Sequence, residues 1–558
     1  MQKKIQKVVL GLAAFLTIAI GVCATRNSEA SGLSSSANIG WKPGSTIFGH
    51  RFHTGTGLAP VSDSAPLSPG DLDPSFDGDG RVTTQFGGSE DVATSVALQT
   101  DGKIVTAGYS SGATTSAFVA RYNADGSLDT SFGTGGKATQ EFGAGFTLAT
   151  SMALQADGKV VVAGYTKAVS PATTGFDFFV LRYNTNGTLD TTFDGDGRAT
   201  TDFGVFDEAD ALAIQADGKI VVTGYSSSPP SERTLACIAR YNTDGSPDAS
   251  FGVAGKVQNH EGSAFSVAVQ PSDGRIVTGG WGCAAATCTQ NLDFTFARYD
   301  TAGSPDPSFG TGGKATVAIS SGRDEVRAIA LQADGKIVAA GVNLSSLAAD
   351  PVTIVRLNTN GSLDTTFGTS GIVQNLSPVV EDAFGLSLQP NGKIITGGRI
   401  FNTANDSDFA IMRLNTNGSL DTSFGGSGIV STAFTGNLDG ITSFAIQGDG
   451  RILAAGFAES QAGDIDAALA RYLAPVSISG RVTTPSGTGI RNTILTITDS
   501  LGVKQTATTS SFGFYTFDNV KLGQGYQIIV NSRLYRFAPL NNLTVTDSMT
   551  GVDFVGLE

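Results

Sequence analysis

The stretch Gly126-Ser127-Leu128-Asp129-Thr130-Ser131-Phe132-Gly133 occurs, with small changes, seven times in this chain of 558 residues. Its phenylalanine recurs at Phe76, Phe132, Phe193, Phe251, Phe309, Phe367 and Phe424, so consecutive copies are 56 to 61 residues apart. A repeat that keeps its register in this way indicates one supersecondary unit copied along the chain.

We call this eight-residue stretch the phrase, and each of its copies is surrounded by the same pattern of short strands. A short strand follows the phrase, and the next strand ends in glutamine. A glycine turn such as Asp101-Gly102 leads to an apolar strand such as residues 159–164, and residues 179–183 are typical of the last strand. The Asp-Gly turn tolerates the positive φ that a tight antiparallel hairpin requires. Seven four-stranded sheets of this kind predict an all-β fold, a seven-bladed β-propeller.

The seven repeats form an array, and the strands at its two ends predict how the propeller closes. The array begins with the strand that follows the first phrase, residues 81–86, and ends with the other three strands, residues 441–472. The first strand therefore has one vacant place, beside the last three, and we expect it to close the seventh blade there. This closure would remove an exposed sheet edge, which can template aggregation.

An arginine in each last strand precedes the aspartate of the next phrase by eight residues. Arg471 has no such aspartate after it and Asp73 has no arginine before it, so we expect these two to pair across the closure. A carboxylate can accept two hydrogen bonds from one guanidinium, which favours structural pairs over a ring of binding arginines. The predicted pairs are Arg121 with Asp129, Arg182 with Asp190, Arg240 with Asp248, Arg298 with Asp306, Arg356 with Asp364, Arg413 with Asp421 and Arg471 with Asp73.

The phrase Leu128-Asp129-Thr130-Ser131-Phe132-Gly133, followed by Gln155-Ala156-Asp157-Gly158-Lys159-Val160, resembles the delta-60 repeat family. The resemblance covers residues 71–473 and implies a propeller of secreted or surface type without a defined reaction. Some copies depart from the pattern, with Pro247 and Pro305 in place of the leucine.

Residues 474–558 have a different character. Ile478-Ser479-Gly480-Arg481-Val482-Thr483 and Gly513-Phe514-Tyr515-Thr516-Phe517 resemble a carboxypeptidase regulatory-like domain, a small transthyretin-type β-sandwich. The resemblance implies a stabilising or adhesive appendage without the catalytic group of a peptidase. Phe512 stands where that family would have an acidic residue.

The N-terminus predicts export. Three lysines precede the uncharged apolar residues 8–22, which is typical of a signal peptide, here residues 1–24. Cleavage after Ala30 and lipidation of Cys23 are the alternatives. Residues 25–70 are rich in Ser, Gly and Pro and predict a disordered linker. We expect a secreted, cell-surface or periplasmic protein with no membrane span in the mature chain, because residues 8–22 are shorter than a spanning helix.

The charge of the chain excludes one class of partner. The formal net charge is −14, and removal of residues 1–24, with three Lys and no acid, makes it −17. Such a chain is repelled by phosphate backbones, so nucleic acid is not an expected partner.

The remaining cysteines and histidines suggest little chemistry. Cys283 and Cys288 lie five positions apart and predict a disulfide in one loop, since export permits oxidation. Cys237 lies in an apolar strand and is expected to be buried and inert. The three histidines, His50, His53 and His260, do not have the spacing of a metal site.

Two sets of acidic residues are candidates for binding. Asp77, Asp79, Asp194 and Asp196 form Asp-Gly-Asp-Gly turns that could hold calcium, but the equivalent turn 133–136 has no acid, which favours a purely structural turn and no cofactor. The second set lies eight residues before the glutamine, where these acids would either ring one mouth of a central channel or cap their own turns, as we favour. It consists of Asp91, Asp207, Asp324, Glu381 and Asp439, with Thr147 and Gly262 in the other copies.

The sequence therefore predicts a monomeric, exported, non-catalytic scaffold. Nearly every acid belongs to a repeated position, whereas a catalytic group is needed once. The variable loops 166–176, 226–233 and 283–291 would present a surface to a protein or a glycan. The alternative is a propeller hydrolase or lyase that acts on polysaccharide. Such an enzyme would need two carboxylates near the channel mouth, outside the repeated positions.

Overall fold

The computed structural model contains only strands and turns in the residues that it describes. The expected signal peptide, residues 25–66, Cys288 and most of the three variable loops are outside them. The same part of the chain contains no helix that could span a lipid bilayer. The described residues are 67–142, 145–167, 175–228, 233–283, 292–344, 352–374, 376, 380–403, 406–434, 438–474, 476–500, 502–521, 525–545 and 549–557.

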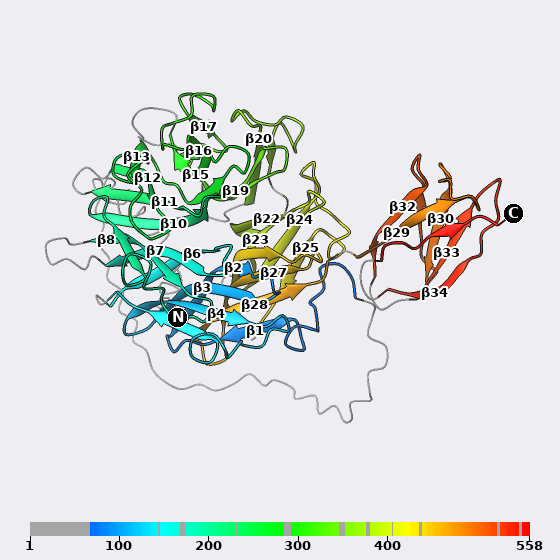
Figure 1. Cartoon of the computed structure of the whole chain (residues 1–558), viewed down its shortest axis with the longest axis horizontal. Coiled ribbons are helices and arrows are strands. Elements are labelled where there is room, and N and C mark those ends of the chain that lie inside the picture. The colour runs from blue at the N-terminus through cyan, green and yellow to red at the C-terminus, as the bar shows by residue number, and fades with distance from the viewer. Residues whose placement is uncertain are drawn as a thin grey trace, which may run out of the picture. The chain divides into compact units, whose positions relative to one another are not determined.

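Seven groups of four antiparallel strands, which we call sheets, follow one another along the chain (Figure 1). Single parallel pairs, Glu90 with Ile465 and Phe206 with Phe176, join two pairs of these groups edge to edge into eight-stranded sheets. In the first sheet the strands pair in chain order: β2 (Glu90–Leu98), β3 (Ile104–Ser111), β4 (Thr115–Tyr122) and β5 (Lys137–Gln140). We number the sheets 1 to 7 and call the first strand of each the inner strand. The repeat unit predicted from the sequence, which begins after the phrase, is thus divided between two sheets.

Sheets 2 to 6 repeat this order. Their strands are β6 (Thr147–Leu154), β7 (Val160–Lys167), β8 (Phe176–Tyr183) and β9 (Arg198–Thr201); β10 (Phe206–Ile214), β11 (Ile220–Ser228), β12 (Arg233–Tyr241) and β13 (Lys256–Glu261); β14 (Ser266–Val269), β15 (Ile276–Gly282), β16 (Asp293–Tyr299) and β17 (Lys314–Val317); β18 (Asp324–Leu331), β19 (Ile337–Asn343), β20 (Val352–Leu357) and β21 (Ile372–Val373); β22 (Val380–Leu388), β23 (Ile394–Thr403), β24 (Asp406–Leu414) and β25 (Ile429–Thr432).

Sheet 7 joins the two ends of the array. Its strands β26 (Asp439–Ile446), β27 (Ile452–Glu459) and β28 (Ile465–Tyr472) are completed by β1 (Arg81–Thr84), which pairs antiparallel with β28 from Arg81 opposite Ala470 to Thr84 opposite Ala467. No sheet closes on itself. The inner strands nevertheless contact one another in a cycle, in the order β2, β6, β10, β14, β18, β22, β26 and back to β2.

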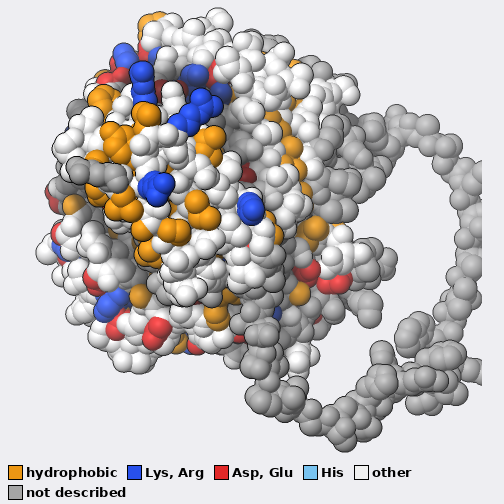
Figure 2. Space-filling model, turned by 90° about the vertical axis from the view of Figure 1, so that its right-hand side faces the viewer, with side chains coloured by type: hydrophobic (Ala, Val, Ile, Leu, Met, Phe, Trp, Pro, Cys, Tyr) orange, Lys and Arg blue, Asp and Glu red, His pale blue; other side chains and the backbone are white. Residues whose placement is uncertain are grey.

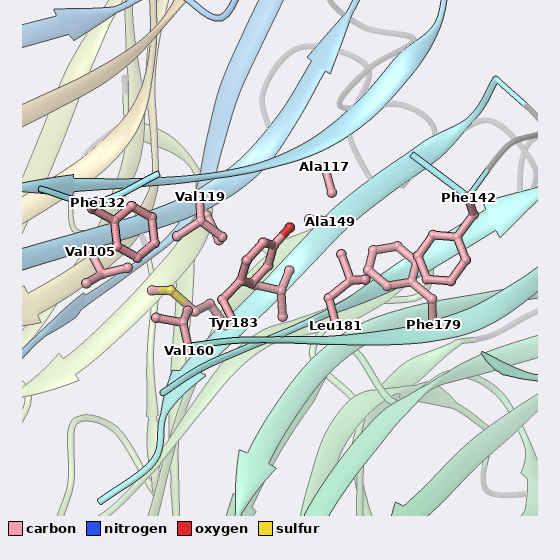
Figure 3. Packing of buried hydrophobic residues seen from close by; sticks show 13 residues of the cluster. Val105, Ala117, Val119, Phe132, Phe142, Ala149, Val160, Phe179, Leu181 and Tyr183 are labelled. Atoms are coloured by element: carbon pink, nitrogen blue, oxygen red, sulfur yellow. The ribbon is translucent and has the colours of Figure 1, made fainter. Parts of the chain in front are cut away.

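Adjacent sheets pack through apolar side chains on their facing surfaces. Figure 3 shows one of these cores, in which Val105 and Val119 from sheet 1 meet Val160 and Leu181 from sheet 2, with Phe132 of the repeated phrase among them. An equivalent core joins the two ends of the repeat array, since Phe76 and Val82 are buried with Leu453 and Leu469 of sheet 7. Each sheet is therefore stable only against its neighbours.

The strands after the phrase are shorter than predicted. Residues 81–86 were expected to be extended, but β1 ends at Thr84, and residues 371–376 contribute only Ile372–Val373. The cause is visible at Phe86, whose backbone N–H donates to Asp91 Oδ2 at 2.5 Å instead of to a neighbouring strand. A carboxylate that captures this donor ends the pairing.

Residues 476–557 form two further sheets around one core. One sheet has the order β32 (Phe514–Val520), β29 (Val476–Thr483), β35 (Phe554–Val555), and the other the order β31 (Lys504–Thr508), β30 (Ile494–Asp499), β33 (Gly525–Asn531), β34 (Leu540–Thr544). Ile478 and Phe517 of the first sheet are buried with Leu495 and Ile528 of the second.

Candidate functional site

The structure brings all seven Arg and Asp residues of the expected pairs together. Each Arg Nε donates to Oδ2 of its aspartate at 2.7 or 2.8 Å, and the pair Arg471 with Asp73 has the same geometry as the six local pairs. In the first sheet Arg121 also donates to Ser131 Oγ at 3.1 Å and to the carbonyl of Thr185, which belongs to the next sheet, at 2.5 Å. Nε, Nη1 and Nη2 of Arg121 all donate, so this guanidinium supports the fold, whereas Nη1 of Arg413 has no partner among the described residues.

The aspartates of these pairs are held in the charged form. Burial alone would raise the pKa of Asp129, but hydrogen bonds from Lys103 and Ser131 and the charge of Arg121 outweigh burial and hold the pKa well below its usual range. The pKa of Asp421 is lowered to about 2, where hydrogen bonds from Lys393 and Ser423 and the charge of Arg413 again outweigh burial.

Four of the five acids before the glutamine cap their own turns. Asp91, Asp207, Asp324 and Asp439 are fully buried. Each accepts a backbone N–H from the residue four or five positions earlier, as Asp439 does from Phe434 at 2.7 Å. Such enclosed carboxylates do not form an exposed ring at a channel mouth. Glu381, the fifth, is half-buried in a β22 that is irregular between Glu381 and Gly385.

These caps predict a pH-dependent stability. Burial raises the pKa of Asp439 to about 7, above its value near 4 in the unfolded chain. Because the folded state binds this proton more tightly, the contribution is favourable below pH 4 and is lost as the pH rises toward 7. Asp439→Asn should therefore match the wild type at pH 4 and exceed its free energy of unfolding by about 1–3 kcal/mol at pH 8. Urea unfolding at both pH values measures this; a difference independent of pH would contradict it.

The predicted calcium turns do not gather into a cluster. Both carboxylate oxygens of Asp79 accept hydrogen bonds from Arg81 in the same turn. Asp77 and Asp194 have positive φ, in keeping with a turn shaped by its backbone. Among the described residues, one group of carboxylates has ligand atoms within 4.8 Å of one another, and it consists of Asp177, Asp202 and Asp207.

The cysteines are placed in part. Cys283 is disulfide-bonded, while its expected partner Cys288 is outside the described residues. Cys237 is a buried free thiol, and burial raises its pKa. It is therefore an inert residue of the core, as the sequence predicts.

Six of the seven inner strands have a bulge or irregularity, and in sheet 4 the equivalent residue directly precedes β14. The residue at this position divides the sheets into two groups. In sheets 1, 2 and 7 the bulge holds Thr94, Thr150 and Thr442, and each hydroxyl donates to a carbonyl of the next inner strand. Sheets 3 to 6 have other residues at this position, namely Asp210, Phe265, Arg327 and Phe384. In sheets 3 to 6 a charged or aromatic residue thus replaces the threonine that makes the hydrogen bond between inner strands in sheets 1, 2 and 7.

Further charged residues surround the bulge in sheets 3 and 5. Glu325 forms ion pairs with Arg327, at 2.6 Å from Nη2, and with Arg323. Tyr225 donates its hydroxyl to Glu208, which lies two residues before Asp210. We call Glu208, Asp210, Tyr225, Arg323, Glu325 and Arg327 the inner-strand cluster.

Aromatic rings cover this cluster. The Arg327 guanidinium lies 5.2 Å from the ring centre of Phe265 and 5.8 Å from that of Phe384, and Arg323 lies 5.3 Å from that of Trp281. Tyr225 contacts Phe265 edge to face. The faces of these aromatic rings attract the guanidinium groups electrostatically and so help to hold them in place.

Burial raises the pKa of two carboxyl groups of the cluster, those of Asp210 and Glu208. Burial raises the pKa of Asp210 well above its ordinary range, the charge of Glu208 adds to this, and Arg327 opposes it. Burial likewise raises the pKa of Glu208 to about 7, although the hydrogen bond from Tyr225 lowers it. Neither oxygen of Asp210 finds a hydrogen-bond partner among the described residues, and Asp210 is only 7% exposed. A buried group left unpaired is costly unless something binds it.

The sequence could have revealed this cluster only through its exceptions. Glu208 and Glu325 share their position in the repeat with Val92, Leu148, Ser263, Asp382 and Gly440, and Asp210 shares its position with Thr94, Thr150, Phe265, Arg327, Phe384 and Thr442. Alignment of the copies at the bulge gives the signal, because Thr changes to Asp, Phe and Arg within consecutive copies.

Residues 476–557, which we call the last unit, carry an exposed apolar surface. Figure 2 shows hydrophobic side chains gathered with several Lys and Arg side chains on one face of the molecule. Of the eight exposed large hydrophobic residues in the described chain, seven belong to this unit, so its surface differs from that of the repeat array. They are Ile494, Val503, Phe512, Phe514, Leu534, Val555 and Leu557.

The family model that matches this chain agrees with the repeat, and its description names no activity. The model of the "Domain of unknown function (DUF5122) beta-propeller" matches residues 99–132, 155–193, 215–251, 272–309, 332–367, 389–424 and 447–474. No curated protein matches the sequence.

Solved structures similar to this chain are distant. A catalytically inactive virginiamycin B lyase from Staphylococcus aureus is 12% identical over 70% of this chain and 98% of its own, with a TM-score of 0.41. A protein of unknown function from Dyadobacter fermentans is 12% identical over 70% and 97%, with a TM-score of 0.37. The β-propeller domain of the Trilobed protease from Pyrococcus furiosus is 11% identical over 68% and 94%, with a TM-score of 0.36. The chain is a β-propeller repeat protein, whose seven matching segments carry a family description without a function.

Proposed function

We propose that this chain is an exported, non-catalytic scaffold that binds a glycan or a protein outside the cell or at its surface. In this proposal the array is a seven-bladed propeller closed by β1. The last unit is a β-sandwich of the carboxypeptidase regulatory-like type, and its exposed phenylalanines provide adhesion. The protein acts as a monomer without a cofactor.

The observation that carries this proposal is the inner-strand cluster. Its residues depart from the repeat, combine aromatic rings with charges, and leave the carboxyl group of Asp210 without a partner. Residues that interrupt a repeated structural bond are retained for another reason than the fold, and recognition of a polar ligand is a role that suits them.

A second candidate is a hydrolase or lyase acting on polysaccharide. It is favoured by the same carboxyl groups, because a general acid needs a raised pKa, burial raises that of Asp210, and Glu208 lies two residues away. Against it stands the placement of both carboxyl groups on one strand, β10, only two residues apart. A glycosidic bond must lie between the two carboxylates that cleave it.

A glycan array and a pulldown from cell-surface protein, both with the full chain, test the proposal. Asp210→Thr and Arg327→Thr introduce the residue that three other sheets have at the bulge, and each should lose at least about tenfold in affinity. Asp210→Thr breaks no ion pair and should fold like the wild type, whereas Arg327→Thr removes one partner of Glu325 and should lower the melting temperature. Thr442→Ser at the bulge of sheet 7 is the matched control and should bind like the wild type. Equal binding by all three variants would contradict a role for the cluster.

The same chain and glycans distinguish the scaffold from the enzyme candidate. If the chain is a non-catalytic scaffold, incubation with a polysaccharide that it binds should produce no new reducing ends and no unsaturated uronate absorbance. New chain ends that disappear in Asp210→Asn would overturn the non-catalytic proposal in favour of the second candidate.

A further inference from the structure

A groove with a cavity volume of about 660 Å³ opens beside the junction of sheets 1 and 2. Its walls are the segment that follows β1, the phrase and strand β5, and the turn that follows β8. Polar side chains predominate in it, including Gln85, Lys137, Gln140, Asn186 and Thr188, and no carboxylate is among the lining residues. It is separate from the inner-strand cluster, with which it shares no residue.

Tyr183 at the wall of this groove lacks a hydrogen bond that its counterparts make. Four other copies have a tyrosine here, and each hydroxyl is bonded to the strand that follows the phrase. They are Tyr122 with Thr84, Tyr241 with Thr201, Tyr299 with Asn259 and Tyr472 with Thr432. The Tyr183 side chain is 2% exposed, yet its hydroxyl has no partner among the described residues.

The reason lies in one substitution within the repeat. Gln140 occupies the place of Thr84 and Thr201 at the end of its strand, and its side-chain amide donates to the Glu141 carbonyl at 2.9 Å instead. The buried hydroxyl of Tyr183 is therefore left without a partner at the wall of this groove.

Two cations near Tyr183 have spare donors as well. The Arg198 guanidinium is close enough to Tyr183 to oppose the rise that burial causes in its pKa, and Arg198 Nε is buried without a partner in the described chain. Lys137 donates to the Gln85 carbonyl at 2.6 Å and lies 5.2 Å from the Phe86 ring centre. An ammonium has three donors, so Lys137 can serve a further acceptor.

These donors define the chemistry of the occupant. The Tyr183 hydroxyl and the Lys137 ammonium, with no acid among the groove-lining residues, favour an acceptor that carries negative charge, and a carboxylate is such a group. The amide and hydroxyl side chains of Gln85, Gln140 and Thr188 suit a ligand rich in hydroxyls. The acidic chain repels polyanions, so a short ligand with few charges fits best.

We propose that this groove binds a short, uronate-bearing saccharide, with Tyr183 and Lys137 as ligands of its carboxylate. The inference rests on the proposed function only in treating the chain as a binder, and it assigns a site and a ligand class that the inner-strand cluster does not provide.

Calorimetry with the full chain and trigalacturonate tests the inference. Tyr183→Phe should lower the affinity about tenfold, in line with the loss of one hydrogen bond to a charged group, and Lys137→Gln should do so as well. Trigalactose, which lacks the carboxylates, should bind at least tenfold more weakly than trigalacturonate. Triglutamate presents carboxylates on a peptide and should not compete.

Tyr122→Phe is the matched control. It removes the same hydroxyl from a tyrosine that is bonded to Thr84, so it should lower the melting temperature and leave the affinity unchanged. Tyr183→Phe should show the reverse, a wild-type melting temperature with weakened binding. The variants of the inner-strand cluster should bind trigalacturonate normally.

Several outcomes would overturn the inference. Absence of trigalacturonate binding, or binding that Tyr183→Phe and Lys137→Gln do not change, would remove the groove as a site. Equal binding of triglutamate would remove the saccharide as its ligand class. If another glycan bound and Asp210→Thr abolished that binding, the proposed function would stand while the groove inference failed.

Discussion

A chain that begins at residue 88 is expected to lose the cooperative unfolding of the repeat array and to form oligomers. The deletion removes β1 and leaves the outer edge of β28 unpaired, and it exposes the core in which Phe76 and Val82 are buried. Each buried side chain of this size contributes about 1.5–3 kcal/mol. Together with the unpaired Arg471 the loss is on the order of 5–10 kcal/mol, similar to the whole stability of many domains.

Light scattering after size exclusion and calorimetric melting measure this effect. A chain that begins at residue 67 is the control, since it keeps β1 and the segment around Asp73, and it should melt as a monomer like the full protein. If the chain beginning at residue 88 were also monomeric with the same melting temperature, β1 would not be needed to complete sheet 7.

The second large effect is expected from Asp73→Asn. Asp73 Oδ2 lies 2.8 Å from Arg471 Nε and 3.0 Å from Arg451 Nε, and the substitution leaves the Arg471 charge buried without its partner. Breaking a buried ion pair from one side costs about 3–5 kcal/mol, which urea unfolding at pH 7 can measure. Asp79→Asn in the same turn is the matched control, because its pair with Arg81 is exposed and should contribute less than about 1 kcal/mol.

The pH dependence of this loss has a definite sign. Burial raises the pKa of Asp73, but hydrogen bonds from Ser75 and the charges of Arg471 and Arg451 outweigh it and lower the pKa. A carboxylate with a lowered folded pKa stabilises the protein above its unfolded pKa near 4 and loses that contribution as the pH falls further. The difference between Asp73→Asn and the wild type should therefore shrink below pH 4. A loss as small as that of Asp79→Asn at pH 7 would contradict the buried pair.

The repeat allowed the sheets and their ion pairs to be predicted, because both are periodic. An arginine and an aspartate eight residues apart fall on the last strand and the following turn in every copy, so one local geometry serves them all. The pair between Arg471 and Asp73, nearly 400 residues apart, followed from the same count. Strand ends were less predictable, since a carboxylate such as Asp91 captures the N–H that would have continued β1.

The inner-strand cluster and the groove could not be predicted in the same way. Asp210 and Arg327 look like ordinary polar residues in alternating strands, and only the bulge turns them toward other residues of the cluster. Tyr183 matches its copies in sequence and differs only in the partner that Gln140 fails to provide. Such sites arise where the repeat is broken, so reasoning from the repeat passes over them.

The pairing of β1 with β28 also sets an order of events during synthesis. The ribosome makes β1 near the start of the chain and its partner about 380 residues later, so at about 5–20 residues per second β1 waits roughly 20–80 s. Throughout this time the first strand and the edge of each newest sheet are open to other chains. We therefore expect the nascent protein to depend on a holding chaperone until β28 has emerged, and a chain stalled before residue 465 to be far more prone to aggregate than the finished one.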